Sequence, residues 1–236
     1  MEYYSPDTEF IMKYIKELKL PTVKDSLDDI ITDATVGQWD YRKFLRVLFE
    51  REVEQRIENR KYGRIRKANF PQMKYLQELV REELPADCRN LLPEFETLNF
   101  IREGRNIVMY GNPGTGKTHT AIGLGIKACM DGFTVYFTTV PHLLTQIREA
   151  KTGKTLQQME NRFRKYDLVI CDEMGYVGFD KEGADLLFNM ISTRTGTRAT
   201  IITTNLPFTR WEEVIKDKVL CSALVDRLCH KAHMVN

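Results

Sequence analysis

A glycine-rich loop directly after the apolar segment 107–110 holds the residues of this chain that are best suited to chemistry. Its glycines let the backbone curl with the N–H groups pointing inward, so that the loop can wrap the phosphates of a nucleotide. The lysine adds a positive charge for the β and γ phosphates, and the following threonine offers its hydroxyl to Mg²⁺ at the start of a helix. A strand before the loop and a helix after it disfavour a chance glycine turn. The loop residues are Gly111, Asn112, Pro113, Gly114, Thr115, Gly116, Lys117 and Thr118.

Two carboxylates, Asp172 and Glu173, follow a predicted buried strand over residues 167–171. In a P-loop ATPase the first acid of such a pair belongs to the Mg²⁺ shell, and the second polarises the water that attacks the γ-phosphate. Because ligands of α/β sheets bind at the carboxyl ends of the strands, we expect both acids beside the phosphate loop. The pair alone is equally compatible with a surface turn, and it is the loop that favours catalysis.

Two more polar residues could complete such a site. Asn205 follows the apolar run 199–204 and could hold the attacking water, or it could cap the next turn. An additional strand with a polar residue, inserted between the loop strand and the acid strand, distinguishes one class of ATPases from nucleotide kinases and GTPases. Arg227 lies on a short helix expected to begin at Ser222, and it could stabilise the γ-phosphate charge in a neighbouring subunit. The alternative is a solvated ion pair with Asp226 or another acid.

The elements that must position these residues alternate between apolar strands and helices from about residue 71 onward. This alternation is the signature of a parallel sheet with helices on both faces. The sequence therefore predicts an α/β fold with a five-stranded parallel sheet. The expected strands cover residues 106–110, 133–138, 167–171, 199–204 and 232–235.

The beginning of the chain has a helical pattern instead of strands. We expect helices over residues 5–20, 21–37 and 40–60, followed by the turn-forming sequence Asn-Phe-Pro. The sequence thus predicts a small all-helical domain over residues 1–68, for binding DNA or a partner, and an ATPase domain over residues 69–236.

Composition and charge limit the class of protein. The chain has 236 residues, of which 42% are hydrophobic and 29% charged, enough to bury a full core. We find no apolar segment that could span a bilayer, and the first residues carry acids where a signal peptide needs positive charge. The five cysteines are scattered and mostly lie in apolar runs, which is typical of reduced thiols. We therefore expect a cytoplasmic protein that does not contact membranes.

The net charge of +2 conceals a basic stretch near the end of the helical segment. It contains the single acid Glu58, so it is a candidate nucleic-acid contact, with a solvated helix face as the alternative. Its basic residues are Arg56, Arg60, Lys61, Arg64, Arg66 and Lys67.

The motifs along the chain resemble those of the IstB family, the transposition helper ATPases encoded by bacterial insertion sequences. That family is closely related to DnaC-type helicase loaders within the AAA+ class. The resemblance covers nearly the whole chain, including the helical segment. The segments that carry it most clearly are 111–119, 171–176, 187–192, 204–208 with Trp211, and 226–228 with His230.

The resemblance implies an AAA+ P-loop ATPase core that uses ATP and Mg²⁺, with His119 among the nucleotide-binding residues. It also implies a homo-oligomer that assembles with ATP on duplex DNA and passes the target site to a partner transposase. In initiator-type AAA+ proteins a helical pair inserted between the second and third strands lines the nucleic-acid path, although here too a solvated face is the alternative. The basic residues of that segment are Arg148, Lys151, Lys154, Arg162, Arg164 and Lys165.

The resemblance leaves several alternatives. The family usually continues past the final strand with a Gly-x-Ser-Tyr-Arg segment, so we expect a chain that ends at Asn236 to be C-terminally truncated. A DnaC-like replicative helicase loader would use the same core but dock a helicase and prefer single-stranded DNA. Glu173 and Arg227 disfavour a scaffold that binds ATP without hydrolysis, and the strand before Asn205 disfavours a small-molecule kinase.

Overall fold

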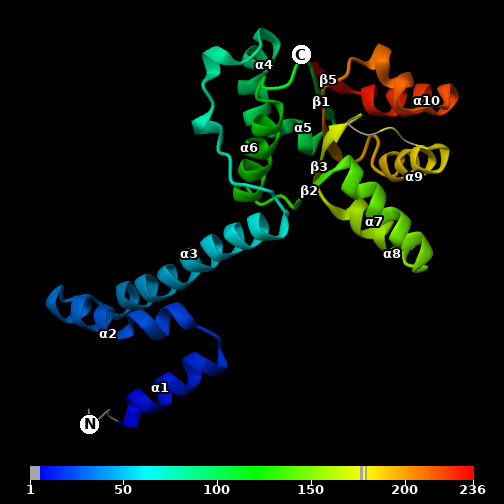
Figure 1. Cartoon of the computed structure of the whole chain (residues 1–236). Coiled ribbons are helices and arrows are strands. Elements are labelled where there is room, and N and C mark those ends of the chain that lie inside the picture. The colour runs from blue at the N-terminus through cyan, green and yellow to red at the C-terminus, as the bar shows by residue number, and fades with distance from the viewer. Residues whose placement is uncertain (1–5, 176–177, 179) are drawn as a thin grey trace. The chain divides into compact units, whose positions relative to one another are not determined.

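The computed structural model describes residues 6–175, 178 and 180–236 (Figure 1). The chain divides into two compact units, Met1–Lys61 and Tyr62–Asn236. Ser5, the expected N-cap of the first helix, and Tyr176, in a segment of family resemblance, lie outside the described residues. In the ranges given above, no helix is long and apolar enough to cross a membrane.

The first unit is built from helices that share a small apolar core. Ile15, Val23 and Leu27 are its buried residues, and Leu48 packs against them. These side chains recur at helical spacing, so each helix turns one apolar stripe toward the others. The helices are α1 (Pro6–Glu17), α2 (Pro21–Val36) and the first part of α3 (Tyr41–Lys67).

A buried carboxylate from α3 holds the start of α2. Glu52 accepts hydrogen bonds from the backbone N–H groups of Thr22 (2.9 Å) and Val23 (3.1 Å), and from Nε of Arg56 (2.8 Å). The first N–H groups of a helix lack partners within the helix and favour negative charge. Because the N-cap residue Leu20 makes no side-chain hydrogen bond, Glu52 supplies the cap from another helix.

Helix α3 is longer than the sequence predicts. It was expected to end near Arg60 but continues to Lys67, and Asn69 follows it in a left-handed conformation with φ +65°. The extra turns bring Ile65 and Ala68 into the core of the second unit. The basic stretch therefore lies on the helix rather than at its exit. The division between the compact units falls inside α3, whereas the predicted domain boundary is at residue 69.

The second unit contains the predicted five-stranded sheet, with the order β2-β3-β4-β1-β5 and parallel pairing throughout. Strand β4 lies between β1 and β3, as expected for the additional strand. Strand β3 extends beyond its predicted end because Met174 still pairs with Thr204 after a register shift. The strands are β1 (Asn106–Tyr110), β2 (Val135–Thr139), β3 (Leu168–Met174), β4 (Ala199–Thr204) and β5 (Ala232–Val235).

Helices cover both faces of this sheet (Figure 1). Alternate strand residues point to opposite faces: Ile107 and Ile201 pack with α4, α5 and α6, while Val108 and Ile202 pack with α7, α9 and α10. The helices are α4 (Ala86–Glu96), α5 (Asn99–Arg102), α6 (Lys117–Met130), α7 (Val140–Thr152), α8 (Leu156–Lys165), α9 (Lys181–Ser192) and α10 (Lys218–Cys229). Short 3₁₀ turns cover Leu76–Glu78, Arg81–Glu83 and Phe208–Glu213.

Helix α10 begins earlier than the sequence predicts. The side chain of Asp217 accepts a hydrogen bond from the backbone N–H of Leu220 at 3.1 Å, which makes Asp217 the N-cap in place of Ser222. The helix thus starts five residues earlier than expected, and Arg227 lies in its last turn.

Candidate functional site

The predicted phosphate loop joins β1 to α6 at the carboxyl edge of the sheet. Gly116 directly precedes α6 and has φ +83°, a conformation that glycine adopts without strain. At Gly111, with φ +129°, an added Cβ would lie 2.6 Å from Oδ1 of Asn236. The backbone angles at both positions therefore favour glycine, and the first turn of α6 follows the loop with N–H groups that suit an anion.

Lys117 opens α6 and folds back over the loop. Its Nζ donates hydrogen bonds to the carbonyl oxygens of Gly111 (2.9 Å) and Asn112 (2.7 Å). Burial lowers the pKa of Lys117, and the nearby charge of Asp172 partly opposes that shift. Within the described residues no ion pair joins Lys117 to a carboxylate, so its charge is available to a phosphate.

Asp172 is buried and accepts hydrogen bonds from two threonine hydroxyls. Its side chain is 5% exposed, and Oδ1 accepts hydrogen bonds from the hydroxyls of Thr118 (2.9 Å) and Thr203. Carboxylate and hydroxyl oxygens are ligands that suit Mg²⁺. Thr118 and Asp172 together therefore fit the metal shell that the sequence assigns to them.

The backbone of Glu173 departs from extended strand geometry at the register shift between Cys171 and Met174. It has φ +61°, which is strained for a residue with a side chain, and its N–H donates to Oγ1 of Thr203 at 3.1 Å. The hydroxyl of Thr203 therefore contacts both acids. It donates a hydrogen bond to the Asp172 carboxylate and accepts one from the backbone N–H of Glu173. Sequence reasoning missed this residue, although a hydroxyl two positions before Asn205 on the strand beside β3 was a usable signal.

An open cavity of about 380 Å³ brings the phosphate loop, Glu173 and Asn205 together. Oγ1 of Thr204 accepts a hydrogen bond from the N–H of Leu206 at 3.1 Å, so Thr204, rather than Asn205, makes the side-chain bond of this turn. That observation weakens the alternative that Asn205 serves as a turn cap. The residues that line the cavity are Lys74, Pro113, Gly114, Gly116, Lys117, Thr118, His119, Glu173, Thr203, Thr204 and Asn205.

One wall of the site comes from the segment before α4, which sequence reasoning did not assign. Nε2 of His119 lies 2.9 Å from the carbonyl oxygen of Tyr75, and Lys74 lines the cavity. No sequence motif predicts that this segment borders the site. Its position beside α6 results from tertiary packing. His119 thus lies at the cavity, as the family resemblance implies, and also contacts this wall.

Arg227 stands apart from the cavity of its own chain. Its side chain is exposed on α10 and is not among those that line the cavity. It makes no hydrogen bond or ion pair with any described residue, so the ion pair with Asp226 considered above does not form. An exposed, uncompensated guanidinium is compatible with a contact to another subunit.

Half of the basic stretch on α3 is occupied by contacts within the chain. Arg56 and Lys61 pair with glutamates at 2.8 and 2.6 Å, and Nε of Arg64 donates to the carbonyl oxygen of Cys129 at 2.6 Å. Such contacts reduce the charge available to an external phosphate. The exposed members without an acidic partner among the described residues are Arg60, Arg66 and Lys67.

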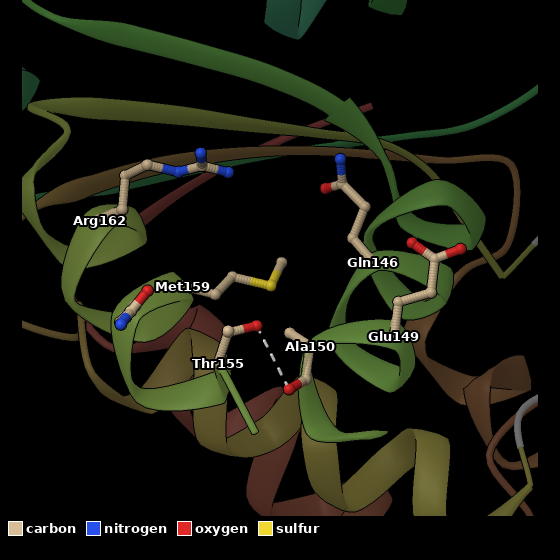
Figure 2. Close-up of a pocket in the computed structure, with 7 residues that line it drawn as sticks. Gln146, Glu149, Ala150, Thr155, Met159 and Arg162 are labelled. Carbon is tan, nitrogen blue, oxygen red and sulfur yellow. Dashed lines mark hydrogen bonds between the residues drawn. The ribbon is translucent and has the colours of Figure 1, made fainter. Parts of the chain in front are cut away.

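The basic segment between β2 and β3 forms helices α7 and α8, as predicted. Figure 2 shows Arg162 across a pocket from Gln146 and Glu149, and this pocket between the helices has a volume of about 520 Å³. Arg148 and Lys151 pair with acids of the α9 region, the second at 2.7 Å from Glu182. The remaining basic side chains, Lys154, Arg164 and Lys165, are exposed without an ion pair to a described residue.

The family model of the IstB-like ATP binding proteins matches residues 13–236. The chain belongs to this family. It is 32% identical over 222 residues to the ATP-binding protein of insertion sequence IS232 from Bacillus thuringiensis subsp. berliner. That match covers 94% of this chain and 89% of the relative. The ATP-binding protein of IS21 from Pseudomonas aeruginosa is 29% identical, with 94% and 84% covered.

Solved structures share the AAA+ P-loop fold of this IstB-like chain. DnaI matches with a TM-score of 0.58 at 17% identity, over 69% of this chain and 89% of DnaI. AMPPCP-bound DnaA from Aquifex aeolicus matches with a TM-score of 0.56 at 18% identity, over 69% and 50%. At these identities the likeness concerns the fold alone. The family and the fold class predicted from the sequence are confirmed.

Proposed function

We propose that this IstB-like protein is an ATPase that binds duplex DNA and helps a partner transposase to use it as a target. The observation that carries the proposal is the cavity lined by the phosphate loop, Glu173 and Asn205, in which Thr118 also donates a hydrogen bond to Asp172. Family membership supports the link to insertion sequences, and the relatives are described as ATP-binding proteins.

In this proposal each side chain has a distinct task in ATP hydrolysis. The loop N–H groups and Lys117 hold the β and γ phosphates, while Thr118 and Asp172 would hold Mg²⁺, which neutralises phosphate charge when bound. Glu173 takes a proton from the attacking water, and Asn205 orients that water against the γ-phosphate. Because Thr203 contacts both acids, it holds Glu173, the proton acceptor, at a fixed position relative to Asp172, the metal ligand.

Assembly would complete the site. Arg227 of one subunit reaches the γ-phosphate held by its neighbour, so that hydrolysis depends on a homo-oligomer formed with ATP and DNA. The support is that Arg227 is exposed, outside the cavity of its own chain, and unpaired with any described residue.

For the DNA contact we propose the exposed basic side chains of α3 and of α7 and α8. They would bind phosphates without reading sequence, which makes affinity strongly dependent on salt. The exposed side chains that have no acidic partner among the described residues, such as Arg66 and Lys165, are the first to test.

The proposal is tested by measuring binding to duplex and single-stranded DNA of equal length at one salt concentration, with ATP and with ADP. We expect ATP-dependent binding that prefers duplex. A preference for single strands would favour a DnaC-like helicase loader instead. Equal DNA binding with ATP and with ADP would contradict the coupling of ATP to assembly.

A further inference from the structure

The first unit carries a groove that the ATPase site does not use. It lies where α1 turns into α2, has a volume of about 740 Å³, and is formed by residues between Met12 and Lys24. Ile15 is buried in its floor, Met12 and Leu20 are half-buried there, and Pro21 adds an exposed ring. An apolar floor of this kind suits a nonpolar face of another segment, because burying it removes apolar surface from water.

The rim of this groove has one sign of charge. All the charged residues that line it are lysines, and each is exposed. None of them makes an ion pair with an acid in the described part of the chain. The rim therefore presents four lysines that lack a direct ion pair in this part of the chain, beside the apolar residues of the groove. The lysines are Lys13, Lys16, Lys19 and Lys24.

We propose that this lysine-rimmed groove docks an amphipathic helix from another protein, with its apolar face on the floor and acidic side chains toward the lysines. The apolar floor argues for a peptide rather than nucleic acid, since a phosphate backbone offers nothing to cover Met12, Leu20 and Pro21. The charges on the rim select an acidic partner and accelerate its binding, while the floor provides most of the affinity. The inference is independent of ATP hydrolysis, because the groove lies entirely in the first unit.

The test uses the full-length protein and a labelled synthetic helix of about 18 residues, with leucines along one face and glutamates elsewhere. Binding is followed by fluorescence anisotropy at several salt concentrations. We expect saturable binding that weakens as salt rises. A peptide of the same composition in scrambled order, and one with serine in place of leucine, should each bind at least about tenfold more weakly.

Variants test the location. Lys13→Glu combined with Lys16→Glu reverses two exposed rim charges without touching the floor, so the fold should persist, as checked by circular dichroism and thermal melting. We expect about a tenfold loss of peptide affinity. The matched control is Lys216→Glu with Lys218→Glu, which changes two exposed lysines in the second unit and should bind as the parent does.

Three results would overturn the proposal. The first is equal binding of the scrambled peptide, which would indicate nonspecific attraction to charge. The second is equal loss of affinity in the double variant and its control. The third is displacement of the peptide by duplex DNA together with a matching loss of DNA binding in the Lys13→Glu, Lys16→Glu variant, which would make the groove a nucleic-acid surface.

Discussion

Asp172 and Glu173 are neighbours in the chain but have different surroundings. Asp172 is buried beneath hydroxyl groups, whereas Glu173 is exposed in the cavity. Glu173→Gln keeps the shape and removes the proton acceptor, so we expect ATP binding and assembly to persist while hydrolysis falls by about a hundredfold or more. Phosphate release and nucleotide affinity measure the two effects. Unchanged turnover would remove Glu173 from this role.

Thr203 gives a second prediction for a single residue. Thr203→Val keeps the volume but removes the hydroxyl that contacts Asp172 and the Glu173 backbone. A hydrogen bond to a charged group is worth about 1.5–3 kcal/mol, so we expect turnover to fall by about tenfold to a hundredfold. The Mg²⁺ concentration needed for half-maximal turnover should rise as well.

The control for Thr203 is Thr138→Val, another buried hydroxyl, which donates to the adjacent Thr139 carbonyl oxygen and also bonds to the side chain of Tyr136. It lies on β2 and does not contact either acid. If both variants lose the same activity, the hydroxyl of Thr203 has no specific positioning role.

At the scale of elements, the start of α2 depends on the charge of Glu52. Burial raises the pKa of Glu52, but hydrogen bonds from Arg56 and from the Val23 and Thr22 backbone outweigh it, so the pKa lies below its ordinary value of 4.5. The cap therefore stabilises the first unit at pH values above 4.5. Its contribution disappears as the pH falls through the lowered pKa of the folded state.

Glu52→Gln tests this cap. We expect it to lower the free energy of unfolding by about 1–3 kcal/mol at pH 7, measured by urea denaturation, and to make the difference from the parent vanish at acidic pH. Glu54→Gln, on an exposed position of the same helix, should change little. Equal effects of the two variants at pH 7 would show that the cap contributes no stability.

The sequence predicts the boundaries of some helices and strands more accurately than those of others, and the difference has physical causes. Strands β1, β4 and β5 begin and end where expected because their apolar runs are bounded by turns. The late end of α3 was missed because it depends on burying Ile65 in another part of the fold. Likewise, the loop and acid motifs predict which residues share the cavity, but Thr203 and Lys74 reach it only through strand pairing and tertiary packing. The roles of the site residues remain predictions.

At the scale of the whole molecule, the role proposed for Arg227 would make hydrolysis a property of an assembly. Arg227→Ala should bind ATP normally yet lose most turnover, and mixing it with the inactive Lys117→Ala variant should restore activity, because each supplies what the other lacks. Arg210→Ala, which removes an exposed ion pair with Glu213, is the matched control. Full activity of Arg227→Ala alone would contradict a role in a neighbouring site.

The continuity of α3 from Tyr41 to Lys67 also determines how this molecule can be dissected. Proteases bind extended chain, so a limited digest should cut elsewhere before it separates Lys61 from Tyr62. A gene fragment that begins at residue 69 would discard Ile65 and Ala68 from its own core, at a cost of about 2–5 kcal/mol. A fragment that begins at residue 62 keeps them and should express as the better folded ATPase, so the place to cut lies within a helix.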